Sequence, residues 1–134
     1  MAILRNQAAA IPIRDGLICL ITSSNGERWI IPKGMIDRGH TPIQAALQEA
    51  WEEAGLVGII QAEAAGSYVY EKAGSKRMVT VYPMQVTAEH AVYPEYRLRR
   101  REWVTPSEAA SRIQEPGLRD ILVGLFRLVS VASA

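Results

Sequence analysis

The alternation of apolar and polar residues predicts that the chain begins with strands. Residues 8–14 and 16–22 are short apolar segments of strand length, and Asp15-Gly16 between them is typical of a two-residue turn. Pro12 has no backbone N–H to donate to a neighbouring strand, so we expect it at a sheet edge or in a bulge. The first part of the chain is therefore predicted to form a hairpin.

A loop and then a helix are predicted next. Pro32-Lys33-Gly34 breaks regular structure, and we expect the loop to continue through Gly39. Thr41-Pro42-Ile43-Gln44 begins a helix, because Thr can cap it, Pro suits its first position and Gln completes a capping box. The helix is predicted to run to Ala54 and to stop at Gly55. Apolar residues at three- and four-residue spacing give its core-facing side: Ile43, Ala46, Leu47, Ala50 and Ala54.

The remainder of the chain alternates strand and helix signals. Strands are predicted over residues 56–71, 77–88 and 96–104, with a turn at Ala73-Gly74-Ser75. A second helix is expected from Thr105-Pro106-Ser107-Glu108, and a third over 118–130 after an interruption at Pro116-Gly117. Without repeats, low-complexity tracts or a linker, residues 1–134 are predicted to form one domain with an α+β fold.

Composition narrows the class of protein. A chain of 134 residues that is 49% hydrophobic can build one core. It has no apolar run of membrane-spanning length and no N-terminal secretory signal, so a cytoplasmic location is expected. The single cysteine, Cys19, lies in an apolar run and is predicted to be a buried core residue. A net charge of +1, with no aromatic platform, argues against a nucleic-acid partner.

The first predicted helix carries an acidic stripe. Glu49, Glu52 and Glu53 share one face, and residues 39–71 contain no Lys or Arg to offset them. A solvated surface helix is one interpretation of this pattern. The other is a divalent-metal site, because Mg²⁺ takes carboxylate oxygens and keeps waters, one of which can attack phosphorus.

The segment from Gly34 to Leu56 resembles the Nudix box, G-x5-E-x7-R-E-U-x-E-E-x-G-U, in which U is aliphatic. The matching positions are Gly34, Glu49, Glu52, Glu53, Gly55 and Leu56. His40 replaces the first glutamate of the pattern, and Gln48 replaces its arginine. In the family the arginine orients its neighbouring glutamate and the first glutamate has a lesser, supporting part. The resemblance therefore implies retained metal ligands with altered support around them.

This resemblance also implies a fold and a cofactor. The fold is the Nudix fold, an α/β/α sandwich with a central mixed, partly antiparallel sheet. The cofactor is Mg²⁺ or Mn²⁺, held by Glu49, Glu52, Glu53 and the carbonyl of Lys33. These glutamates are the predicted catalytic residues, with Glu53 the principal ligand and Glu49 either a ligand or the base for the attacking water.

Residues outside the box extend the resemblance over about residues 8–125. Arg14, the segment 28–34 and Arg101-Glu102-Trp103 are similar to the diphosphoinositol polyphosphate phosphohydrolase branch. That branch hydrolyses diphosphoinositol polyphosphates, and often diadenosine polyphosphates. Gly34 is predicted to let the backbone approach the anionic substrate closely. The side chains predicted to bind that substrate are all basic: Arg14, Arg28, Lys33, Lys72, Arg77, Arg99 and Arg101. Glu102 is a candidate for an extra ligand or acid.

Two functions are compatible with these observations. The first is metal-dependent hydrolysis of a phosphoanhydride in a diphosphoinositol or dinucleoside polyphosphate. The second is a catalytically weak Nudix-fold module that binds or senses such ligands, which the retention of all three helix glutamates disfavours. Both imply a small-molecule polyphosphate partner, no nucleic acid or membrane, and a monomer or homodimer.

Overall fold

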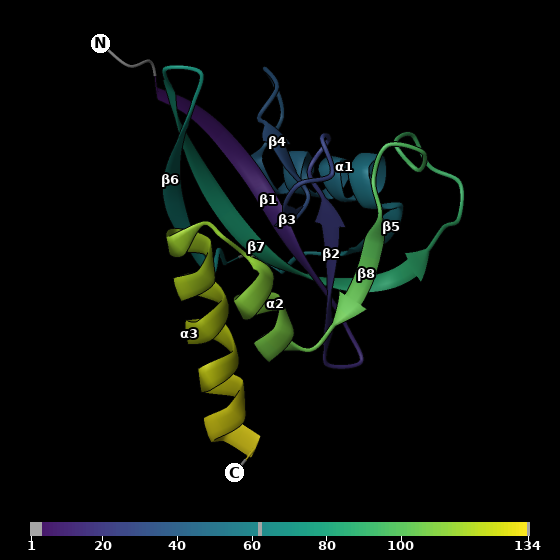
Figure 1. The fold of residues 1–134 in the computed structure, drawn as a ribbon, viewed down its shortest axis with the longest axis vertical. Coiled ribbons are helices and arrows are strands. Elements are labelled where there is room, and N and C mark those ends of the chain that lie inside the picture. The colour runs from purple at the N-terminus through teal and green to yellow at the C-terminus, as the bar shows by residue number, and fades with distance from the viewer. Residues whose placement is uncertain (1–3, 62, 134) are drawn as a thin grey trace.

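The computed structural model describes residues 4–61 and 63–133, which form strands and helices in a mixed order (Figure 1). The elements are β1 (Leu4–Arg14), β2 (Leu17–Thr22), β3 (Trp29–Ile30), β4 (Lys33–Met35), α1 (Pro42–Ala54), β5 (Leu56–Ile59), β6 (Gly66–Lys72), β7 (Ser75–Glu89), β8 (Arg101–Val104), α2 (Pro106–Arg112) and α3 (Pro116–Ser133). Among the described residues, no helix is long and apolar enough to cross a membrane.

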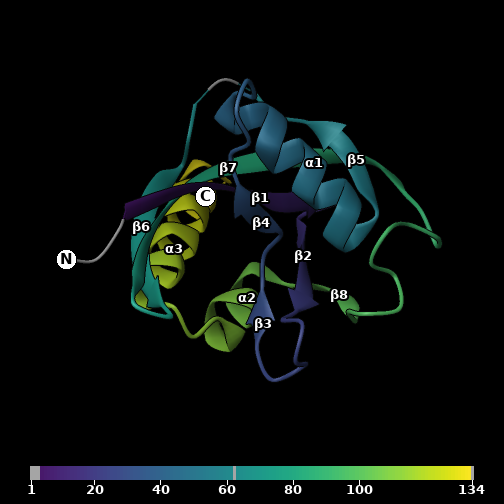
Figure 2. The same cartoon turned by 90° about the horizontal axis from the view of Figure 1, so that it is seen from above.

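Strands β1 and β7 form the centre of one mixed sheet. They run parallel, with Leu4 opposite Lys76 and Ile13 opposite Gln85. Strands β2 and β4 pair antiparallel with β1, β5 and β6 pair antiparallel with β7, and β3 and β8 pair with β2. Helix α1 covers one face of the sheet while α2 and α3 cover the other (Figure 2). This confirms the predicted α+β sandwich with a mixed, partly antiparallel sheet.

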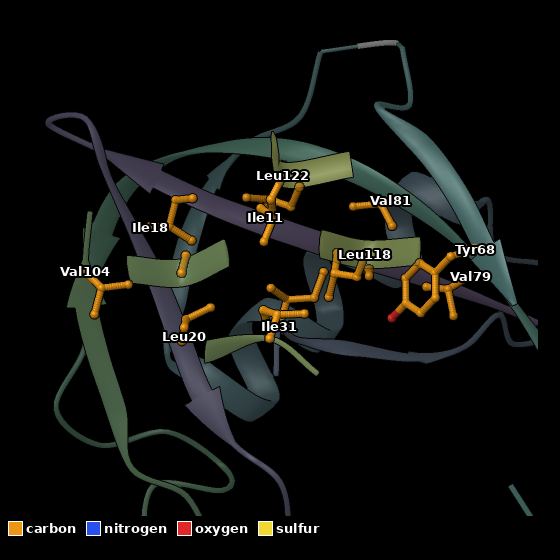
Figure 3. Packing of buried hydrophobic residues seen from close by; sticks show 13 residues of the cluster. Ile11, Ile18, Leu20, Ile31, Tyr68, Val79, Val81, Val104, Leu118 and Leu122 are labelled. Atoms are coloured by element: carbon orange, nitrogen blue, oxygen red, sulfur yellow. The ribbon is translucent and has the colours of Figure 1, made fainter. Parts of the chain in front are cut away.

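The alternation along β2 separates two cores. Ile18 and Leu20 belong to the cluster under α2 and α3, where Leu118 and Leu122 of α3 join them (Figure 3). The intervening residues, Cys19 and Ile21, belong to the cluster under α1. This follows from the two-residue period of a strand, and it confirms that Cys19 is buried.

The α1 core is built largely from alanine. Ala8 and Ala10 of β1 face Ala46 and Ala50 of the helix in this cluster, and all four are fully buried. Such small side chains let the helix lie close to the sheet. The carboxylates on the next stripe of the helix are thereby brought near the backbone of β4.

Helix α1 has the predicted boundaries. The Thr41 hydroxyl accepts from the Gln44 amide, and the Gln44 side chain accepts from the Thr41 amide, so the capping box is complete. Gly55 ends the helix with φ of 68° and donates its N–H to Trp51 O. These signals act over a few residues, which is why sequence alone locates them.

Pro12 is not at an edge, and that prediction is wrong. The Ala10 amide donates to Pro32 O, and successive N–H groups alternate sides, so the Pro12 nitrogen faces the same side as that of Ala10. On that side β1 pairs with β4 over Gln7–Ala9 and with β2 over Ile13–Arg14. Pro12 lies between the two pairings, where its missing donor costs no ladder hydrogen bond.

Several other boundaries also differ from the predictions. Residues 33–35, expected in a loop, form β4, and the single strand expected over 56–71 is two strands, β5 and β6. The strand expected over 96–104 contains only β8, because residues 96–100 form turns and irregular backbone. Pro116 opens α3 instead of interrupting the chain before it, since proline suits the first turn of a helix. The turns at 15–16 and 73–74 are present, with positive φ at both residues of each.

Replacing Gly55 by alanine should destabilise the protein. Its left-handed backbone disfavours a side chain by about 1–2 kcal/mol, and an added Cβ would also overlap the Tyr93 ring. We expect Gly55→Ala to lower the free energy of unfolding by at least that amount in urea titrations. Gly124→Ala is the matched control: it lies in α3 with open space around it, so it should raise stability by about 0.5–1 kcal/mol. Equal stability of both variants would contradict this account.

Candidate active site

The site begins where α1 meets β4. The backbone N–H of Lys33 donates to Glu53 Oε1 at 2.9 Å, and Glu53 is only 7% exposed. Next to it, the Glu49 carboxylate packs against Gly34 so closely that a Cβ at position 34 would overlap it. Gly34 is therefore required by the packing of this carboxylate, in addition to its predicted role near phosphate.

Arg99 joins this cluster from the segment before β8. Its Nη2 donates to Glu53 Oε2 at 3.0 Å, and its Nε donates to Glu95 Oε1 at 3.2 Å. The remaining Nη1 donates to the Thr22 carbonyl at 2.9 Å, and the side chain is 10% exposed. Sequence analysis placed Arg99 at the substrate; in the structure its guanidinium is a counterion of two carboxylates.

Glu52 is tied to its surroundings by two contacts. The Gln48 side-chain amide donates to Glu52 Oε1 at 2.8 Å, and the Glu95 backbone N–H donates to the Glu52 carbonyl at 3.0 Å. The first contact joins two residues one helical turn apart, and the amide of Gln48 is neutral. Gln48 thus supports a glutamate but does not neutralise it.

The carboxylates share an excess of negative charge. Burial, together with the charges of Glu53, Glu52 and Glu95, raises the pKa of Glu49 to about 8. Burial also raises the pKa of Glu53, opposed by Arg99 and by the Lys33 amide. Hard carboxylate oxygens with unbalanced charge are the donor set that suits Mg²⁺ or Mn²⁺. In the part of the chain that the structure describes, no three His, Cys, Asp or Glu side chains form a metal-ligand cluster.

Basic and aromatic side chains lie on the other side of Lys33. Its Nζ is 5.1 Å from the centroid of the Tyr70 ring. Burial lowers the pKa of Lys33; Glu53 opposes that shift, whereas the positive charges of Lys72 and Arg28 add to it. A small cleft here is lined in part by Arg28, Trp29, Lys33, Tyr68, Tyr70 and Glu115. Cations and carboxylates thus meet at Lys33.

A hydrogen-bonded row links this cleft to β7. Tyr70 Oη donates to Gln7 Oε1 at 2.9 Å, and Gln7 Nε2 donates to Met35 Sδ at 3.5 Å. Arg77 Nη1 approaches the same sulfur at 3.8 Å. Arg77 therefore lies beside Met35 of β4, and its predicted substrate contact stays a prediction.

Comparison with known proteins identifies the family. A model of the NUDIX domain matches residues 4–123. The chain belongs to the Nudix family. Nudix hydrolase 16, mitochondrial, of Arabidopsis thaliana is 32% identical over 117 residues, covering 81% of this chain and 64% of that protein. Nudix hydrolase 21, chloroplastic, of the same plant is 30% identical, covering 79% and 54%. The chain thus spans less than two thirds of the length of these curated relatives.

Solved structures show the same fold. An Ap4A hydrolase binary complex from C. elegans superposes with a TM-score of 0.80 at 19% identity, covering 94% of this chain and 98% of that one. A MutT protein from Methanosarcina mazei Go1 has a TM-score of 0.76 at 21% identity, covering 94% and 95%. At these identities the likeness establishes the Nudix fold.

Within the Nudix box, the two departures lie at the surface. His40 is exposed, and its backbone N–H donates to Asp37 O at 3.0 Å. Gln48 is exposed as well and bonds only to Glu52 among the described side-chain contacts. His40 is therefore a solvated loop residue.

Arg101 lies at the C-terminal end of α1, and its predicted substrate contact stays a prediction. Its Nη1 donates to Ala54 O at 2.7 Å and to His90 O at 2.8 Å, and its Nη2 is 3.5 Å from a Glu89 oxygen. The guanidinium therefore satisfies a carbonyl at the C-terminus of α1, which is a common use of arginine at a helix end. These contacts hold the guanidinium against the end of α1.

Arg14 and Glu102 also lie apart from the carboxylates. Ala9 is opposite Lys33, so Arg14 is five residues further along β1, roughly 16 Å away. Glu102 accepts two hydrogen bonds from Arg112 of α2, at 2.9 and 3.1 Å, and these bonds lower its pKa. Glu102 is a partner of α2, which corrects its candidacy as an extra ligand or acid.

Glu95 is the acidic residue that sequence analysis missed. It lies in irregular backbone, where no periodic pattern gives its side chain a direction. Its four-residue separation from Arg99 was the only local signal, and such pairs are common on protein surfaces. In the structure its charge acts on Glu49 together with the charges of Glu53 and Glu52 of α1.

The raised pKa of Glu49 makes stability depend on pH. Because its folded pKa of about 8 exceeds the ordinary 4.5, its stabilising contribution is complete below about pH 4.5 and is lost as pH rises to about 8. With metals chelated, Glu49→Gln should therefore be more stable than the parent at pH 8, and its melting temperature should change less between pH 5 and 8. Glu71→Gln, at an exposed position of β6, is the control and should follow the parent. Thermal unfolding across this range tests it; superimposable Glu49→Gln and parent profiles would refute it.

Proposed function

We propose that this Nudix domain hydrolyses a phosphoanhydride in a polyphosphorylated small molecule, with Mg²⁺ or Mn²⁺ as cofactor. The observation that carries the proposal is the position of Lys33. Its amide binds the buried Glu53, and its ammonium group lies in a cleft with Arg28 and Tyr70. Donors that suit a metal and donors that suit phosphate therefore adjoin one another, as cleavage of a metal-bound diphosphate requires.

The side chains divide the chemistry between them. Glu53, Glu52 and Glu49, with the Lys33 carbonyl, would hold the divalent cation. When bound, the cation supplies neutralisation of phosphate charge and a more acidic water. Glu49 is either a further ligand or the acceptor of the water proton. Lys33 and Arg28 would fix the phosphates that do not react.

The favoured substrates are dinucleoside polyphosphates and diphosphoinositol polyphosphates. Lys33, Arg28 and Arg77 suit either compound, because both are polyanions. The fold neighbour described as an Ap4A hydrolase supports the first class. Support for the second class rests on flanking residues, of which Arg101 is used by the fold. A panel that also includes nucleoside triphosphates and nucleoside diphosphate sugars distinguishes these classes.

A polyphosphate-binding module without turnover is the second candidate. Neutral Gln48 at the arginine position of the box favours it. When the glutamates of a Nudix site are less well supported, the rate of hydrolysis falls before the affinity for the ligand does. Equilibrium binding and turnover, measured on the same panel with Mg²⁺ and Mn²⁺, separate the two. Tight binding without product would establish the module.

Removing the principal carboxylate should abolish most activity. Glu53→Gln keeps the size of the side chain and loses its charge, so we expect divalent-dependent phosphate release to fall by roughly a hundredfold or more. Glu71→Gln should retain the parent rate. Phosphate release by Glu53→Gln at the parent rate would exclude the proposed site.

Substrate binding should depend on Lys33 more than on Arg14. Lys33→Met removes a charge-assisted contact, which raises KM by roughly tenfold or more. Arg14→Met removes a charge about 16 Å along β1, so KM should change little. Steady-state kinetics with the best compound of the panel measures both. An equal rise in KM for the two variants would mean that the substrate extends along β1.

A further inference from the structure

We propose that Arg99 is an exchangeable counterion: a divalent cation displaces its guanidinium from Glu53, and the released guanidinium then binds a substrate phosphate. The inference rests on the proposed function for the identity of the cation and the substrate. The charge of the acidic residues is then balanced by Arg99 before the cation binds and by the cation afterwards.

The two oxygens of Glu53 are held by donors of different kinds. Oε1 accepts from the backbone N–H of Lys33, within β4, where the sheet fixes the donor. Oε2 accepts from Nη2 of Arg99, a long side chain with several rotatable bonds. A cation that binds Glu53 can leave the first contact intact, whereas the second places a positive charge at the oxygen it needs. Like charges at such a separation repel, so Arg99 is the partner that moves.

The backbone on either side of Arg99 is anchored, which confines the movement to the side chain. Ahead of it, the Glu95 N–H donates to the Glu52 carbonyl at 3.0 Å. Behind it, the Arg100 N–H donates to Thr22 Oγ1 at 2.9 Å, and the Arg100 carbonyl accepts from the Thr22 N–H at 3.0 Å. Displacement therefore needs a rotamer change and no opening of the loop.

Contacts of Arg99 differ from those of a purely structural arginine. Arg101 donates to the carbonyls of Ala54 and His90, which have no role in binding a cation. Arg99 also donates to one carbonyl, that of Thr22, but its Nη2 and Nε donate to the carboxylates of Glu53 and Glu95. Its charge also acts on Lys33. It thus lies between the acidic residues and the cationic cleft, where a released guanidinium, with its fork of donors, can reach phosphate.

Binding of Mn²⁺ alone, measured by calorimetry on the full chain, tests the exchange. Arg99→Met removes the competitor, so we expect Mn²⁺ to bind about tenfold or more tightly than to the parent. The same variant should melt at a lower temperature with EDTA and gain more from Mn²⁺, because the cation replaces the missing counterion. Its KM for the polyphosphate substrate should rise. Arg100→Met is the matched control: its guanidinium lies over the Trp29 ring, and all of these quantities should stay at parental values.

Unchanged or weaker Mn²⁺ binding by Arg99→Met would overturn the proposal, since Arg99 would then be a spectator or would position Glu53 for the metal. If that variant does not fold, the parent protein crystallised with Mn²⁺ decides: the guanidinium should have left Glu53 Oε2, and its retention beside a metal-bound Glu53 refutes exchange. Tight Mn²⁺ binding with no hydrolysis of any panel compound would refute the proposed function and leave the exchange standing.

Discussion

The burial of one carboxylate, Glu53, at the junction of α1 and β4 governs the arrangement of the site. A buried charge is tolerated only when its oxygens are bonded and its field is balanced. The Lys33 amide and the Arg99 guanidinium bond to these oxygens, and each belongs to a different segment of the chain. Through Lys33 the cationic cleft lies next to the acidic residues, and through Arg99 the segment before β8 contacts α1. Recruitment of Glu95 follows, because the same guanidinium bonds to it.

Close packing beneath α1 makes this junction possible. Alanines at Ala8 and Ala10 on the sheet face alanines on the helix, so the helix axis approaches β1 and its acidic stripe reaches the neighbouring strand β4. At the closest point only glycine is accommodated, since the Glu49 carboxylate fills the space that a Cβ at Gly34 would take. The glycine and glutamates of the box are therefore linked through packing as well as through chemistry.

What sequence analysis could predict depends on how far apart the interacting residues are. The ends of α1 were predicted correctly because Thr41, Gln44 and Gly55 act within one or two turns. The α+β fold and the acidic stripe follow likewise from spacing. The contacts of Arg101 could not be predicted, because its partners Ala54 and His90 become neighbours only in the fold. Across the chain, local signals set the elements and tertiary contacts set the roles of the arginines.

Pro12 and Arg99 show why those tertiary contacts could not be inferred. The rule that excludes proline from a central strand assumes continuous partners on both sides, and β1 changes partner from β4 to β2 at that residue. The strand predicted over 96–104 would place Arg99 and Arg101 on one face, but the backbone is irregular before β8. In both cases the residue obeys the physical rule, and the assumed local structure is what differed.

The departures from the Nudix box are consistent with a charge balance that is not confined to the box. Gln48 leaves the acidic stripe without a cation of its own, and the guanidinium that reaches Glu53 comes from Arg99, 46 residues away along the chain. A counterion supplied by a separate segment can be exchanged without disturbing the helix, whereas one supplied from the adjacent turn is held by helix geometry. With a neutral residue at position 48, the balancing positive charge comes from Arg99, and the carboxylates of α1 remain in place.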